Sequence, residues 1–156
     1  TRRLIVTSSA VIALRYDGKV TNIALSPTAE VDLEVAAWEN LLDIAVGSQS
    51  YSIQGLSGTR EKQTLIGLGK NGTVVMLPDA GIPNAGSWTN LIDIAAGRDF
   101  VVGLRTDGTA VAAGADQMLQ AQVETWQNIV AIDAGDEYCA GLAEDGTVMF
   151  AGDYRY

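Results

Sequence analysis

The segment Trp126–Gly152, WQNIVAIDAGDEYCAGLAEDGTVMFAG, repeats a pattern found 38 residues earlier in Trp88–Gly114, WTNLIDIAAGRDFVVGLRTDGTAVAAG. In both segments tryptophan, glycine and leucine recur at the same spacing. A repeat period of about 20 to 50 residues is typical of solenoids, propellers and other arrays of small units. The sequence therefore predicts an array in which neighbouring units share one hydrophobic core.

The repeat divides the chain into about four units, and unit one lacks the opening tryptophan. Unit two departs from the pattern, because Leu68 lies 21 positions after Gly47, whereas the equivalent residues of units three and four are seven positions apart. About fourteen extra residues therefore lie within 48–63, although a competing register takes 55–59 as a hairpin of its own. The predicted units are 1–37, 38–87 with the insertion 48–63, 88–125 and 126–156.

Two connecting segments have patterns of their own. Acidic and apolar residues alternate over 30–35, which favours a half-exposed edge strand, with a short helix as the alternative. The segment 115–125 is rich in glutamine, and we expect a surface loop or an outer strand there.

Each unit contains leucine three residues before an Asp-Gly or Asn-Gly pair. Asp-Gly between apolar runs predicts a two-residue hairpin of type I′. The aspartates could suggest a metal or catalytic site, but such side chains commonly accept hydrogen bonds from their own turn, and we favour that role. The turns are Leu14 to Gly18, Leu68 to Gly72, Leu104 to Gly108 and Leu142 to Gly146.

The other repeated residues also predict structural roles. The strand-ending glycines, Gly47, Gly97 and Gly135, allow either a close approach of backbones or a positive φ. The three tryptophans are expected to pack between neighbouring units rather than to form a ligand cage. Cys139 is expected to be an inert buried thiol. Because the apolar runs are short and bounded by glycine, four-stranded blades of an all-β propeller fit this chain better than helical repeats.

Composition narrows the classes of function. Ten Lys and Arg against nineteen Asp and Glu give a net charge of −9, which disfavours nucleic acid and anionic membranes as partners. With one cysteine and no histidine, the chain forms no internal disulfide and lacks the commonest catalytic base, so we expect no cofactor, no metal site and no enzyme activity. The apolar runs are too short to span a bilayer, and we expect a soluble protein.

The chain begins at Thr1 without methionine or a signal-peptide pattern, which indicates a processed, trimmed or excerpted chain. The compartment is therefore unmarked, with an extracellular or cell-surface location slightly favoured over the cytoplasm.

The repeated motifs resemble the regulator-of-chromosome-condensation repeat, especially its bacterial versions, and the resemblance covers essentially the whole chain. The histidine that often follows the Ala-Gly element in that family is absent here, so nothing that depends on it is carried over. The motifs that carry the resemblance are the opening tryptophan, Ile94-Ala95-Ala96-Gly97, Gly141-Leu142, Asp145 to Val148, and Ala151-Gly152-Asp153.

The resemblance implies a seven-bladed β-propeller for a complete member, and about four units fall short of a ring. Either the chain is part of a longer propeller, or two copies associate to complete a ring, since an open array leaves sheet edges exposed. A closed ring of four blades is a third option.

The same resemblance implies a protein-binding module that holds its partner with loops on one face. Loops at equivalent positions in successive blades gather on one face, and aromatic and arginine residues are frequent interface anchors. Ser8 and Ser9 would contribute from unit one. The main candidate binding residues are Arg98, Asp99, Asp136, Glu137, Tyr51, Arg60 and Lys62.

Three other functions stay open. The name-giving member of the family implies a guanine-nucleotide exchange factor acting on chromatin, although the acidic charge disfavours nucleosome contact. A hydrolase that uses Asp99 and Asp136 as a carboxylate pair is a weaker hypothesis. A structural repeat segment of a secreted or surface protein is the last.

Overall fold

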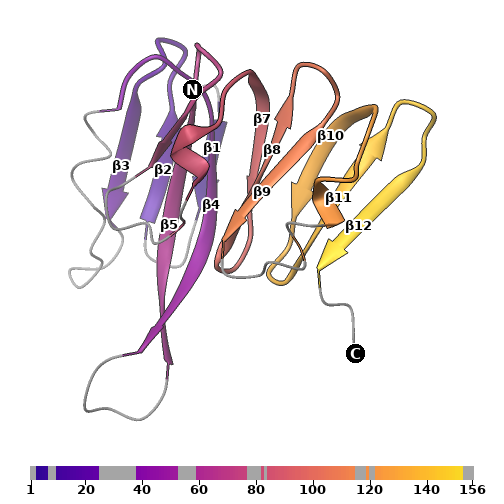
Figure 1. The fold of residues 1–156 in the computed structure, drawn as a ribbon. Coiled ribbons are helices and arrows are strands. Elements are labelled where there is room, and N and C mark those ends of the chain that lie inside the picture. Colours follow the sequence, from indigo (N-terminus) through magenta and orange to yellow (C-terminus); the bar gives the residue numbers. More distant parts are fainter. Residues whose placement is uncertain are drawn as a thin grey trace.

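A computed structural model of the chain describes residues 3–6, 10–24, 38–52, 59–76, 82, 84–114, 119 and 122–152. These residues form four antiparallel sheets that follow one another along the chain (Figure 1). The array of all-β units predicted from the repeat is therefore confirmed. We number the sheets 1 to 4 in chain order.

Each sheet has three strands in sequential order, joined by hairpins. Sheet 1 consists of β1 (Arg3–Val6), β2 (Ala10–Leu14) and β3 (Val20–Ala24). Sheet 2 consists of β4 (Leu41–Ser52), β5 (Thr59–Gly69) and β6 (Val74–Met76). Sheet 3 consists of β7 (Leu91–Ala96), β8 (Phe100–Arg105) and β9 (Ala110–Gly114). Sheet 4 consists of β10 (Ile129–Ala134), β11 (Tyr138–Ala143) and β12 (Val148–Gly152).

The described residues give each sheet one strand fewer than the four expected. The alternating segment 30–35 lies outside the described residues. Before sheet 3 the chain forms the short 3-10 helix η2 (Ala85–Ser87). Before sheet 4, Leu119 and Val123 have helical backbone and are fully buried. The expectation of a surface loop or outer strand over 115–125 is thus wrong at these two residues, because their side chains complete the core.

The buried apolar residues that the structure describes form three clusters, and each cluster lies between two successive sheets. One cluster joins Leu14 and Val20 of sheet 1 to Trp38 and Leu41 at the start of sheet 2. The second joins sheet 2 to sheet 3 in the same way. The third joins sheet 3 to sheet 4 and includes Leu119 and Val123. Because an isolated sheet of short strands has no partner that buries either of its faces, each sheet depends on its neighbour for stability.

Each opening tryptophan is buried in one of these clusters, at 8%, 8% and 2% exposure for Trp38, Trp88 and Trp126. Its ring lies over a glycine in the middle strand of its own sheet. A Cβ atom placed on Gly141, for example, would lie 2.8 Å from the Trp126 ring. The predicted packing between units is confirmed, and glycine in the middle strand makes the room for it.

The four Gly-containing turns are present, but they are not of type I′. Gly18 and its three equivalents have positive φ, whereas the aspartate or asparagine before them does not. In the first turn Gly18 N–H donates to the Arg15 carbonyl at 3.0 Å, and Arg15 N–H donates to the Lys19 carbonyl at 2.9 Å. This is a three-residue loop that ends in a left-handed glycine.

The turn aspartates have the structural role that we favoured. The carboxylate of Asp17 accepts the main-chain N–H of Lys19, and Asp107 and Asp145 each accept the N–H two residues on. These hydrogen bonds hold the pKa of the aspartates below the ordinary value, with the Thr109 hydroxyl the largest cause for Asp107.

Candidate functional site

The turn β7–β8, the turn β10–β11 and the β4–β5 hairpin lie side by side and are joined through the backbone. Ser48 N–H donates to the Gly97 carbonyl at 3.1 Å, and Asp99 N–H donates back to Ser48 at 2.7 Å. Arg98 N–H donates to the Asp136 carbonyl at 2.7 Å. We call this surface the loop face; it consists of residues 97–99, 135–137, 48–52 and 59–63.

The strand-ending glycines allow these turns to approach so closely. A Cβ atom on Gly47 would lie 2.3 Å from the Gly97 carbonyl oxygen, and one on Gly97 would lie 2.4 Å from the Gly135 carbonyl oxygen. Neither contact leaves room for any side chain. None of the three has a positive φ, so close backbone approach is the correct choice for Gly47 and Gly97, whereas an added Cβ on Gly135 would meet the Tyr138 side chain at 3.0 Å.

Arg98 connects sheet 3 to sheet 4 with its side chain as well. Its guanidinium lies 2.9 Å from the Asp136 carboxylate and 3.2 Å from the Glu137 carboxylate. The arginine side chain is 32% exposed, whereas Asp136 is 73% exposed. Asp99 has the left-handed backbone that aspartate tolerates better than most residues, with φ 60°. Three of the four predicted turn residues therefore form one exposed ionic cluster, and Asp99 lies next to it in the chain.

This arrangement bears on the hydrolase hypothesis. A general acid needs a carboxyl group with a raised pKa, and a general base needs a free carboxylate near the substrate. The Asp136 carboxylate instead faces a guanidinium in solvent. Its geometry is that of a surface ion pair, which can exchange the arginine for a cationic or hydrogen-bonding group of a partner.

The predicted insertion extends β4 and β5 into one long hairpin. Their register continues from Ser48 opposite Gln63 to Ser52 opposite Thr59, with Tyr51 paired to Arg60 and Gln49 to Lys62. The hairpin projects beyond the ends of the neighbouring sheets (Figure 1). Thr59 begins β5, while the rest of the competing hairpin 55–59 lies outside the described residues, as do Ser8 and Ser9.

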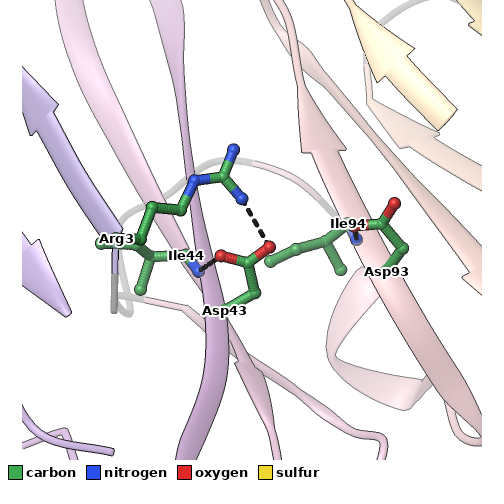
Figure 2. A network of polar contacts seen from close by, with 5 residues as sticks. All are labelled: Arg3, Asp43, Ile44, Asp93 and Ile94. Carbon is green, nitrogen blue, oxygen red and sulfur yellow. Dashed lines mark hydrogen bonds and ion pairs between the residues drawn. The ribbon is translucent and has the colours of Figure 1, made fainter. Parts of the chain in front are cut away.

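A second polar feature, which the sequence did not single out, lies along the first strands of the four sheets. These strands line a groove with a volume of about 590 Å³, which contains Arg3, Asp43, Asp93 and Asp133. Arg3 and Asp43 form an ion pair at 2.5 Å that joins sheet 1 to sheet 2 (Figure 2). Arg3, Asp43 and Asp93 stand at equivalent repeat positions, so aligning the units could have revealed them together.

Asp93 is the carboxylate in this groove whose pKa is raised. Burial is the main cause, and the nearby charge of Asp43 adds to it. The main-chain N–H of Ile94 donates to Asp93 at 2.9 Å and opposes the shift (Figure 2). No cluster of three or more His, Cys, Asp or Glu side chains suited to a metal ion occurs among the described residues.

Cys139 lies in β11, is fully buried, and has a pKa raised to about 12 by that burial. Such a thiol is neutral at physiological pH and is a poor nucleophile. Within the part of the chain that the structure describes, no helix combines the length and hydropathy needed to cross a membrane.

No protein-family model matches the sequence, and no curated protein matches it either. Solved structures match it over nearly its whole length at low sequence identity. The CRINKLY WD40 ectodomain of the Arabidopsis thaliana receptor kinase ACR4 has a TM-score of 0.62 at 16% identity, covering 96% of this chain and 49% of that one. Yeast RCC1 (Prp20), solved with Kap60, has a TM-score of 0.61 at 13% identity, covering 96% and 43%. Human WBSCR16 has a TM-score of 0.52 at 13% identity, covering 92% and 45%.

These matches confirm the fold that the motif resemblance implies. The four sheets correspond to about half of a seven-bladed propeller of the regulator-of-chromosome-condensation type. The chain spans 43% to 49% of the length of these solved chains. We therefore describe the sheets as blades of a partial propeller.

Proposed function

We propose that the chain is a non-catalytic protein-binding module that holds its partner on the loop face. The observation that carries this proposal is the β4–β5 hairpin, which continues for five residue pairs past Gly47 and Thr64. Neither of the other described loop-face turns is extended in this way. A loop extended in one unit of a repeat and not in its described equivalents is more consistent with recognition than with folding.

The ionic cluster beside the hairpin supports the same surface. Asp136 and Glu137 are both exposed, and among the side chains that the structure describes the Arg98 guanidinium faces their two carboxylates. The local charge is thus negative, like that of the whole chain. A partner with a basic patch would be attracted to this face, and such attraction mainly accelerates association.

The proposal is tested by site-specific photo-cross-linking. A photoreactive phenylalanine analogue replaces Tyr51 on the hairpin, and a control variant carries it at Tyr16. Tyr16 is 80% exposed and lies at the β2–β3 turn, at the opposite end of the sheets. In an extract of the cells that naturally produce this protein, we expect the variant with the analogue at position 51 to form one discrete cross-linked product with another protein. The variant with the analogue at position 16 should form none.

A shortened chain provides the matched control. Residues 48–63 are replaced by Arg-Asp, the two residues that connect Gly97 to Phe100 in sheet 3. We expect this chain to fold and to lose the partner identified by cross-linking. Equal capture of that partner by the shortened chain would overturn the role of the hairpin.

A further inference from the structure

The main-chain groups along β4 point alternately toward β5 and away from it. Ser48 N–H donates to the Gly97 carbonyl, and the Ser48 carbonyl accepts the Asp99 N–H, so both groups of Ser48 point away from β5. Residues two positions apart on a strand face the same neighbour, and the register of β4 with β5 is unbroken from Ser48 to the end of the strand. The N–H and carbonyl groups of Ser50 and Ser52 therefore point away from β5 as well.

Ser50 and Ser52 extend this edge of β4 past its last described neighbour. Residues 97–99 form a parallel bridge with β4 at Ser48 and then turn into β8. Among the described residues, no main-chain group outside β5 bonds to Ser50 or Ser52. Figure 1 shows the hairpin continuing past the ends of the neighbouring sheets. The described part of the chain thus fills the edge at Ser48 and leaves it open beyond that point, and an open strand edge is a template for pairing with another chain.

The two strands of the hairpin extension differ in charge. β4 contributes 48–52, Ser-Gln-Ser-Tyr-Ser, which contains no charged residue, proline or glycine. β5 contributes 59–63, Thr-Arg-Glu-Lys-Gln, which contains three consecutive charged residues. Charged side chains and proline are among the means by which proteins protect a strand edge from pairing. The sequence therefore protects the β5 edge and leaves the β4 edge unprotected.

We propose that the β4 edge at Ser50 and Ser52 binds an extended segment of the partner protein, which adds to the hairpin as a further strand. This inference rests on the proposed function, since it specifies how the loop face holds its partner. The added segment forms main-chain hydrogen bonds with both serines, which is the recognition mode known as β-strand addition. Affinity then comes mainly from the backbone of the segment, and specificity from the groups beside the edge.

The ionic cluster beside the edge determines the charge of the segment that fits. Arg98 lies beside Ser48, where the open part of the edge begins, and its guanidinium contacts Asp136 and Glu137. One end of a segment bound to the edge therefore lies beside a cluster whose net charge is negative. Because opposite charges attract and like charges repel across an interface, the segment that fits carries a basic residue at this end.

A phage-displayed library of linear peptides is the probe that tests this inference without the natural partner. Peptides are selected on the parent chain after depletion on the shortened chain, in which Arg-Asp replaces residues 48–63. We expect the selected peptides to be enriched in lysine and arginine. At saturation they should slow hydrogen exchange of the Ser50 and Ser52 amides at least about tenfold, while the Glu61 amide on the β5 edge keeps its rate.

Two proline variants provide a matched control. Ser50 and Glu61 face each other across the hairpin, and the main-chain N–H of each points away from the other strand. Proline removes this N–H and is tolerated on a strand edge, so both variants keep the hydrogen bonds between β4 and β5. Ser50→Pro should raise the Kd of the selected peptides at least about tenfold, because it deletes a main-chain hydrogen bond and obstructs the edge, whereas Glu61→Pro should raise it less than about threefold.

Two results of the peptide experiment would overturn the inference. One is equal affinity of the selected peptides for the two proline variants, and the other is a library that yields no peptide dependent on residues 48–63. The proposed function is tested separately, by cross-linking in the cell extract. A partner that cross-links at position 51 and binds Ser50→Pro as tightly as the parent chain would leave the proposed function standing and would exclude strand addition.

Sedimentation of the parent chain tests a second copy as the occupant of the edge. Each copy has a net charge of −9, and repulsion between like charges opposes the pairing of two such edges, so we expect a monomer. A dimer that dissociates on Ser50→Pro would show that the edge pairs with its own copy, and would contradict the inference.

Discussion

Substituting alanine for Gly97 and for Gly135 should have very different effects on stability, although the two glycines occupy the same place in successive blades. At Gly97 an added Cβ would lie 2.2 Å from the Phe100 ring and 2.4 Å from the Gly135 carbonyl oxygen. Both contacts are about 1 Å too short, and the ring is buried at 2% exposure. Relief therefore requires sheets 3 and 4 to separate.

At Gly135 the nearest atom is in the Tyr138 ring at 3.0 Å. That side chain is 44% exposed, so it can move into solvent. Overpacking of a rigid core costs about 1 to 3 kcal/mol, whereas a change that a free side chain accommodates usually costs less than about 1 kcal/mol. We expect Gly97→Ala to lie in the first range and Gly135→Ala in the second.

Urea denaturation followed by tryptophan fluorescence measures both free energies of unfolding, because all three tryptophans are buried. The comparison is internal, since the two variants make the same chemical change. Equal losses of stability would refute the reasoning, because they would mean that the Gly135 side of sheet 4 is as crowded as the Gly97 side of sheet 3.

Three further predictions concern single side chains. Leu104→Ala should lower the free energy of unfolding by about 2 to 5 kcal/mol, because Leu104 is buried, whereas Leu142→Ala should lower it by less than about 1 kcal/mol, because Leu142 is 40% exposed. Equal losses in urea titrations would contradict this. Asp93→Asn should stabilise the fold at pH 7, because the pKa of Asp93 is raised in the folded chain and its carboxylate therefore costs stability as pH rises through that pKa. The gain in stability should vanish below the pKa of aspartate in the unfolded chain, about 3.9. Thermal melts at pH 7 and below that pKa check both statements. Cys139 should react with a thiol reagent at pH 8 only as fast as the chain unfolds, because the thiol is fully buried and that burial raises its pKa to about 12; rapid labelling of the native chain would disprove this.

Much of the fold could be predicted because the repeat displays each structural requirement several times. Trp126 alone would suggest a core residue or a ligand site, but three tryptophans at one repeat position indicate a shared packing role. The same comparison identified the turn aspartates as parts of their own turns. The turn type was mispredicted, because Asp-Gly occurs both in two-residue loops and in three-residue loops that end in a left-handed glycine.

The candidate site was less predictable, since its residues are the ones that differ between blades. The insertion was located from the spacing of Gly47 and Leu68, yet its continuation of both strands depends on a register that composition does not reveal. The burial of Leu119 and Val123 was missed because the glutamine content of the segment favoured an exposed loop or strand, and two apolar residues four positions apart are too few to indicate a buried helix face. The ion pair of Arg3 and Asp43 was missed because it joins two blades across 40 residues of sequence.

Native-state hydrogen exchange, resolved by strand, tests most directly whether the chain is an open array of blades. In such an array the middle strand β8, which has a neighbouring sheet on both faces, should exchange most slowly. The equivalent strand β11, covered on one face, should exchange at least about tenfold faster through local opening. Equal protection of β8 and β11 in the monomer would contradict the account, because it would mean that sheet 4 is covered on both faces.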